Sequence, residues 1–193
     1  AEAQSLNDMR RNIDAWWPAI EAGAEAILIN ASGCGSTVKE YAFHLQNDAQ
    51  YAQKAQRVSE LAKDIVEILI GETEGLKALF SLAPSAATLA YHPPCSLQHG
   101  QKLGGKVETL LSGLGYPVLL PKDSHLCCGS AGTYSFLQPE LSGRLLQNKV
   151  NNLEALQPKA VLSGNIGCIA HIGSGTDIPV MHWIEYLDQQ LGN

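Results

Sequence analysis

Leu126-Cys-Cys-Gly-Ser-Ala-Gly132 is the stretch of this sequence that constrains the fold most. Two further cysteine segments flank it at a distance, Tyr91-His-Pro-Pro-Cys95 and Gly164-Asn-Ile-Gly-Cys-Ile-Ala-His171, and the three together hold four of the five cysteines. Adjacent cysteines cannot both point into a core from an extended backbone. A loop relaxed by Gly129 and Gly132 can turn both sulfurs toward one ligand. We therefore predict a metal centre here, with iron–sulfur as the leading interpretation.

The sequence around these segments alternates short apolar runs with longer amphipathic ones. Runs of strand length occur at 25–29, 87–91, 117–121, 159–163 and 178–181. Helical patterns occur at 6–22, 36–45, 49–70, 98–114, 139–156 and 183–191, with a short helix and a loop at 72–84. Strands separated by helices of this length predict an α/β fold of Rossmann-like βαβ units with mainly parallel sheets.

Each cysteine follows a predicted strand. In parallel sheets, ligands collect at the carboxyl ends of the strands, so all five thiols are expected on the same edge of their sheets. Iron–sulfur clusters are held by cysteine thiolates, typically four. Cys95, Cys127, Cys128 and Cys168 supply that number and are the predicted cofactor and metal ligands.

A short pattern occurs twice, 134 residues apart. Ala26-Ile-Leu with Gly33-Cys34 matches Ala160-Val-Leu with Gly167-Cys168, which indicates two related halves. We place the boundary between 1–84, a partial first repeat, and 85–193, a second repeat with the complete cysteine set. The first half contains Cys34 alone, so the chain is expected to be a C-terminal fragment of a longer protein.

Composition limits the classes of protein that the chain can be. Its 193 residues are 45% hydrophobic and 17% charged, as in ordinary globular proteins. The net charge of −6 argues against nucleic acid as a partner. No apolar run approaches the roughly 20 residues that span a bilayer, and the N-terminus does not resemble a signal peptide. Five cysteines are too few for a disulfide scaffold of the kind found in oxidising compartments. We therefore expect reduced thiols and a cytoplasmic protein.

The cysteine pattern resembles the cysteine-rich CCG domain family. Cys95 is followed after 31 residues by Cys127-Cys-Gly and later by Cys168. Within the family, Asn30-Ala-Ser-Gly-Cys34-Gly and Cys127-Cys-Gly-Ser-Ala-Gly132 are most similar to the iron–sulfur subunit of glycolate oxidase. The family often ends its repeat Cys-x-x-Cys, whereas this chain has Cys168-Ile-Ala-His171, which makes His171 a candidate fifth ligand.

The resemblance implies an electron-transfer subunit with an iron–sulfur cluster, of [4Fe–4S] type. Its partners would be the flavin-containing glycolate oxidase subunits, which oxidise a 2-hydroxy acid, and a quinone or other membrane electron acceptor. Partner subunits would place it peripherally on the inner membrane. The chain alone is expected not to be catalytic, because it has neither a dinucleotide fingerprint nor a recognisable base for a substrate proton.

Other interpretations stay open. Thiolates suit zinc as well as iron, so the site could be a structural zinc module of a redox complex. Lactate-utilisation or heterodisulfide-reductase-B-like proteins are alternatives within the family. Dithiol exchange through Cys127 and Cys128 would need a strained disulfide, and the four cysteines could be incidental. His92 and His99 are expected to order the loop around Cys95 or to contact the metal ligands from outside, rather than to bind metal, and Cys34 is expected to be unliganded.

Overall fold

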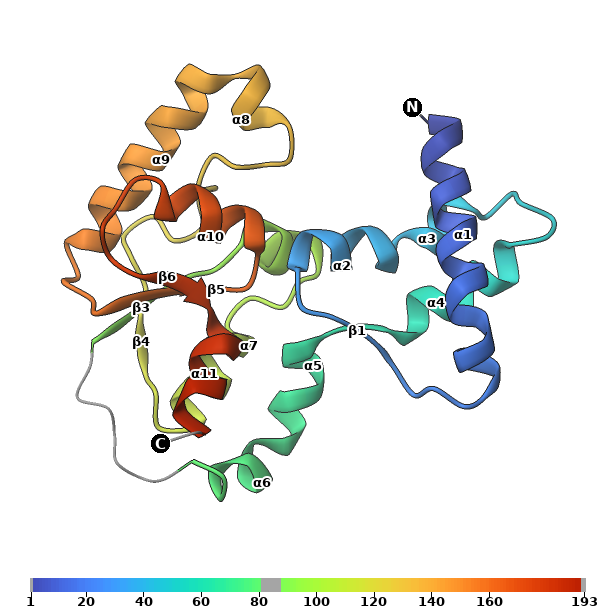
Figure 1. Ribbon diagram of the computed structural model, residues 1–193, viewed down its shortest axis with the longest axis horizontal. Helices are drawn as coiled ribbons and strands as arrows, with labels where there is room; N and C mark the ends of the chain where they lie inside the picture. Colours follow the sequence, from blue (N-terminus) through green and yellow to red (C-terminus); the bar gives the residue numbers. More distant parts are fainter. Residues whose placement is uncertain (1, 81–87, 192–193) are drawn as a thin grey trace. The chain divides into compact units, whose positions relative to one another are not determined.

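A computed structural model describes residues 2–80 and 88–191 of the chain (Figure 1). The chain divides into two compact units, Ala1–Ile65 and Val66–Asn193. Both contain parallel strands joined through helices, which confirms the predicted α/β fold with parallel sheets. The boundary predicted after residue 84 lies within 81–87, outside the described residues, and stays a prediction.

The second unit is built on a four-stranded parallel sheet with the order β4-β3-β5-β6. Its strands are β3 (Leu89–His92), β4 (Val118–Leu119), β5 (Ala160–Ser163) and β6 (Val180–His182). The two central strands pair from Leu89 with Ala160 to His92 with Ser163. Every residue of β3 and β5 is buried. This burial explains why both strands are nearly continuous apolar runs in the sequence.

Helices cover this sheet on both faces. In Figure 1, α9 (Pro139–Glu154) and α10 (Ile166–Gly173) lie on one side of β5 and β6, and α7 (Lys106–Gly113) and α11 (Trp183–Leu191) lie on the other. The shorter elements of this unit are α5 (Ile65–Leu69), η1 (Ile70–Glu72), α6 (Thr73–Lys77), η2 (Ser96–Gly100) and α8 (Tyr134–Leu137). One cluster of buried residues in this unit includes two cysteines: its members are Ala90, Cys128, Val150, Leu153, Val161, Cys168 and Ile172.

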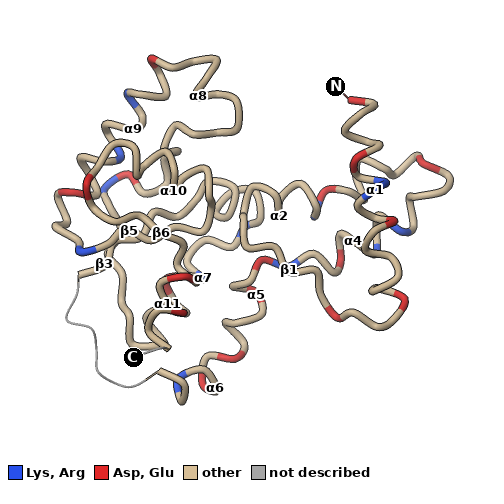
Figure 2. The backbone as a smooth tube through the Cα atoms, viewed as in Figure 1, with Lys and Arg blue, Asp and Glu red and all other residues tan. Residues whose placement is uncertain are grey.

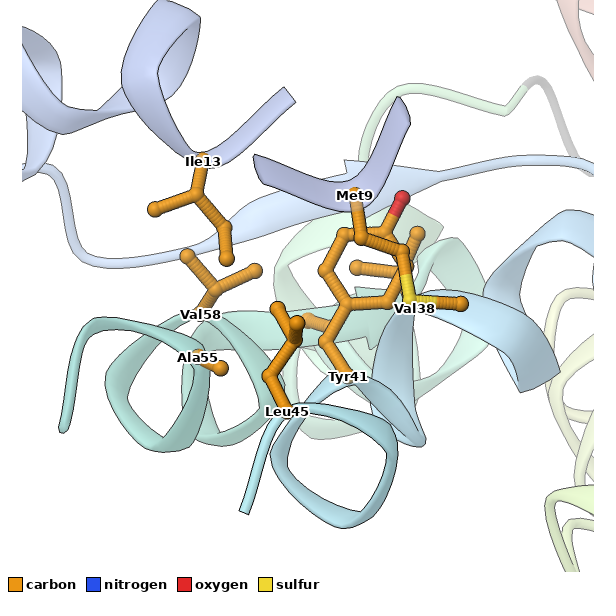
Figure 3. Close-up of a cluster of buried hydrophobic side chains, with 8 residues drawn as sticks. Met9, Ile13, Val38, Tyr41, Leu45, Ala55 and Val58 are labelled. Atoms are coloured by element: carbon orange, nitrogen blue, oxygen red, sulfur yellow. The ribbon is translucent and has the colours of Figure 1, made fainter. Parts of the chain in front are cut away.

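The first unit is mainly helical. It contains α1 (Glu2–Glu21), β1 (Ile27–Ile29), α2 (Ser32–Lys39), α3 (Tyr41–His44), α4 (Ala52–Leu61) and β2 (Ala62–Asp64). Met9 and Ile13, one turn apart on α1, point toward side chains of α2, α3 and α4 (Figure 3). This is the apolar stripe that helical periodicity predicts. Strands β1 and β2 pair in parallel, from Ile27 with Ala62 to Ile29 with Asp64.

Three element boundaries differ from the sequence predictions. The continuous helix expected over 49–70 is wrong, because β2 interrupts it where the chain pairs with β1. The helix expected from 98 begins only at Lys106, as α7. A π-helical turn precedes it, and Gly105, with a φ of +82°, cannot be part of a regular α-helix. The helix expected from 36 begins at Ser32, so Cys34 lies on α2 and not in a turn.

Charged side chains of both signs are interspersed over the described residues (Figure 2). Arg10 of α1, for example, pairs with Asp48 at 2.7 Å. Helix α10, which carries Cys168, contains no Lys, Arg, Asp or Glu. Among the helices of the described residues, none is both long and apolar enough to cross a membrane.

Candidate metal centre

The cysteine segments meet where the strand order reverses. The chain leaves β3 for β4 on one side of the sheet and leaves β5 for β6 on the other, so the carboxyl ends of β3 and β5 form a topological switch point. Ligand sites of open α/β sheets lie at such points. Cys95 comes three residues after β3, and Cys168 is the third residue of α10, directly beyond β5. The Cys127–Cys128 pair lies in the connection after β4.

The four sulfurs form a hydrogen-bonded chain. Cys127 contacts both Cys128 and Cys95, and Cys128 also contacts Cys168. The pKa of Cys127 is lowered, chiefly because Cys128 and then Cys95 donate to it, and the pKa of Cys168 is lowered chiefly by donation from Cys128. The pKa values of Cys95 and Cys128 are raised by the same hydrogen bonds and by burial. These shifts favour the thiolate form at Cys127 and Cys168.

Two N–H groups also point at the sulfurs. The backbone N of Gly129 donates to Cys127 Sγ at 3.3 Å, and Asn165 Nδ2 donates to Cys168 Sγ at 3.6 Å. Hydrogen bonds to a charged form favour it, so both contacts stabilise thiolates. In a metal site such contacts also tune the bound centre.

His92, the last residue of β3, faces the same point. Its side chain is fully buried, its ring contacts the side chain of Cys168, and among the described residues neither ring nitrogen has another hydrogen-bond partner. One nitrogen and the Sγ atoms of Cys128 and Cys168 all lie within 4.8 Å of one another. The backbone is held by Ser163 Oγ, which donates to the His92 carbonyl at 2.9 Å. The expectation that His92 orders its loop or contacts the ligands from outside stays a prediction.

His171 has a different environment. It lies on α10 one turn after Cys168 and is partly exposed. Ser142 Oγ donates to the Gly129 carbonyl at 2.9 Å and lies 3.2 Å from His171 Nε2. Because the hydroxyl proton is used on Gly129, the His171 contact requires Nε2–H to donate. His171 is not in the group of donor atoms that the described residues bring together, and its predicted ligand role stays a prediction.

Gly129 fixes the turn after the cysteine pair. Its φ is +102°, and an added Cβ would lie 2.6 Å from the Ser142 carbonyl oxygen and 3.1 Å from His171 Nε2. Only glycine takes this conformation at no steric cost. The backbone of the Cys127–Cys128 segment can therefore approach α9 closely, which aims both sulfurs inward.

A buried lysine lies beside the sulfurs. Lys149 of α9 is 2% exposed, and its ammonium donates to the Asp123 carbonyl at 2.8 Å. Burial lowers its pKa, and the neighbouring Cys128 opposes that shift. Lys149 also lines a cavity of about 320 Å³ together with Cys127, Asn148 and Asn152. The cavity gives one side of the site access to solvent or to a small partner group.

The donor set fits a thiophilic metal. The Sγ atoms of Cys128 and Cys168 lie within 4.8 Å of each other and of a ring nitrogen of the buried His92. Cys127, outside that group, contacts both Cys128 and Cys95. Thiolate and imidazole donors suit zinc and iron–sulfur centres and not magnesium or calcium. The remaining cysteine, Cys34, is exposed on α2 of the first unit.

Sequence reasoning gave little weight to His92 and did not single out Lys149. The signal for His92 was present, because a histidine directly before Pro-Pro-Cys95 ends a buried strand. The signal for Lys149 was weaker: it occupies the buried face of α9 with Val150 and Leu153, where an apolar residue is expected.

Comparisons with known proteins agree with this site. The cysteine-rich domain family CCG matches residues 89–173, which span all four site cysteines. The "Glycolate oxidase iron-sulfur subunit" of Escherichia coli (strain K12) is 52% identical over 99% of this chain, and the chain spans 46% of that relative. "Uncharacterized protein YkgE" of the same organism is 30% identical, over 88% of the chain and 72% of the relative. "Lactate utilization protein A" of Geobacillus thermodenitrificans is 27% identical, over 88% of the chain and 72% of the relative.

Proposed function

Because the chain belongs to the cysteine-rich CCG domain family, we propose that it is part of the iron–sulfur, electron-transfer subunit of a flavin-dependent glycolate (2-hydroxy acid) oxidase or dehydrogenase. The 52% identity to a glycolate oxidase iron-sulfur subunit supports this choice over the lactate-utilisation relatives, of which the first is 27% identical. The observation that carries the proposal is the convergence of four cysteine sulfurs at the switch point of the second sheet.

In this proposal Cys95, Cys127, Cys128 and Cys168 hold an iron–sulfur cluster of [4Fe–4S] type. Such a cluster supplies one-electron transfer when bound. The chain's own residues set its surroundings: Asn165 and the Gly129 amide donate to sulfurs. Lys149 places a positive charge beside the anionic thiolates. These groups favour the charged form of the site.

The partners in this proposal are flavin-containing subunits that oxidise the hydroxy acid, and a quinone or other membrane electron acceptor. No described helix is long and apolar enough to span a membrane, so association with the inner membrane would go through partner subunits. The chain itself would carry electrons and not perform the substrate chemistry. His171 stays a candidate ligand within this scheme.

We also propose that the two units descend from one CCG repeat. Helix α10 has the same length as α2, and each of its residues lies 134 positions after the matching residue of α2. Cys34 and Cys168 are each the third residue of their helix. The residues of β1 that pair with β2 and the residues of β5 that pair with β6 are also 134 positions apart. A helix follows directly after β2 and after β6. These agreements support a partial first repeat whose matching cysteine is Cys34.

A structural zinc site is the second candidate. The close group of His92, Cys128 and Cys168 favours it, because three mixed donors around one point suit a single tetrahedral ion. Anaerobic reconstitution followed by iron, sulfide and zinc analysis and a visible spectrum distinguishes the two. A brown, reducible chromophore with iron and sulfide supports the electron-transfer proposal. A colourless chain that binds stoichiometric zinc and takes up no iron or sulfide refutes it.

A further inference from the structure

The ring of His92 is buried beside the sulfurs and contacts the side chain of Cys168. We propose that His92 is a direct ligand of the metal centre through one ring nitrogen, beside Cys128 and Cys168. The inference rests on the proposed metal-binding function: at a zinc ion His92 joins Cys128 and Cys168, and at an iron–sulfur cluster it would replace a cysteine on one iron. It adds a nitrogen donor to a site otherwise made of sulfur.

Burial beside sulfur is the first observation. His92 has no exposed surface, its ring contacts the side chain of Cys168, and among residues 2–80 and 88–191 neither Nδ1 nor Nε2 has another hydrogen-bond partner. Buried polar groups are nearly always paired, and an unpaired one is costly. A metal ion bound to one nitrogen would pair that nitrogen, because the ion takes its lone pair, while the other ring nitrogen keeps its proton.

Geometry is the second observation. A ring nitrogen of His92, Cys128 Sγ and Cys168 Sγ lie within 4.8 Å of one another. A tetrahedral ion with bonds of about 2.0 Å to nitrogen and about 2.3 Å to sulfur would bring such donors to roughly 3.5–3.8 Å. The required movement is about 1 Å. His92 ends a central strand whose backbone is held by β5, so the imidazole is presented from a rigid element.

The other histidines near the cysteines differ from His92. His171 contacts Ser142 Oγ through Nε2, and His99 is exposed with Nε2 3.4 Å from the His125 carbonyl oxygen. His92 is the one histidine in the group of clustered donor atoms found among the described residues. His99 is therefore a matched control, since it lies four residues from Cys95 in the sequence, against three for His92, but faces solvent.

The test detects directly whether a histidine nitrogen is bound to the metal. The chain is grown with ¹⁵N-histidine, reconstituted anaerobically with iron and sulfide, reduced, and examined by electron spin-echo spectroscopy. A parallel sample is loaded with Co²⁺ in place of zinc. We expect a hyperfine coupling of a directly bound nitrogen that changes with the isotope. His92→Ala and His92→Cys should lose it, and His99→Ala should keep it. His92→Ala should weaken Co²⁺ affinity at least about tenfold, whereas His92→Cys should retain metal.

The wild-type measurement alone can refute the inference, so it does not depend on a variant that folds. Metal-loaded wild type without a bound-nitrogen coupling would overturn it. A coupling that persists in His92→Ala, or that is lost instead in His171→Ala, would also overturn it. Iron and sulfide analysis reports separately on the proposed function. A chain that takes up no cluster but shows the His92-dependent coupling with Co²⁺ would refute the proposed electron-transfer function and support His92 as a metal ligand.

Discussion

Substitution of Gly129 by Ala should damage both stability and the metal site. The residue has a φ of +102°, and its added Cβ would lie 2.6 Å from the Ser142 carbonyl oxygen. Left-handed backbone costs a non-glycine residue about 1–2 kcal/mol. Overpacking against a fixed backbone atom costs about 1–3 kcal/mol more. We therefore expect Gly129→Ala to lower the free energy of unfolding by about 2–5 kcal/mol, a large part of the roughly 5–15 kcal/mol typical of a domain.

Urea unfolding of the metal-free chain, followed by circular dichroism, measures this loss, and metal content after reconstitution measures the site. Gly143→Ala is the matched control: Gly143 lies next to Ser142 on α9, is exposed, and has nothing within 4 Å of its added Cβ. Helix propensity predicts that this control stabilises the chain, by up to about 1 kcal/mol. If Gly129→Ala matched wild type in stability and in metal content, the proposed role of this turn would be refuted.

Three further predictions follow from contacts in both units. Ser142→Ala leaves the buried Gly129 carbonyl without its donor, and should cost about 1–3 kcal/mol in urea unfolding; an unchanged midpoint would contradict it. Ile13→Ala empties a fully buried position in the first core, and should cost about 2–5 kcal/mol by the same assay. Burial raises the pKa of Glu108 above its usual 4.5; the folded chain then binds this proton more tightly than the unfolded chain, and stability falls as pH rises from 4.5 through the folded pKa. Glu108→Gln should therefore stabilise the chain more at pH 7 than at pH 4, and an equal effect at both would count against this.

The sequence predicted most of the second sheet because its strands are buried on both faces. Continuous apolar runs such as Leu89–His92 and Ala160–Ser163 have few other interpretations in a soluble α/β pattern. The first unit was harder. Ala62–Asp64 continues a helical periodicity, and only its pairing with β1, 35 residues earlier in the chain, makes it a strand. Local patterns do not contain that tertiary contact.

The position of the cysteines at one sheet edge was predictable from the sequence, and that of the other groups of the candidate site was not. Parallel strands followed by cysteines place those cysteines at one edge, and side-chain contacts link Cys95, Cys127, Cys128 and Cys168 there. Their role as ligands stays a prediction. The orientation of His92 depends on strand pairing and burial, which the sequence expresses only indirectly. Lys149 follows helical spacing like any other residue of α9, and its position beside the thiols is a product of packing.

Thiol alkylation read by mass spectrometry tests the central claim most directly. Cys95 and Cys127 are partly exposed without metal, so they can report protection, whereas Cys128 and Cys168 are already buried. In the metal-loaded chain we expect Cys34 alone to be modified, and removal of the metal to make Cys95 and Cys127 reactive. Equal modification of Cys95 and Cys127 with and without bound metal would contradict a shared metal centre at these sulfurs.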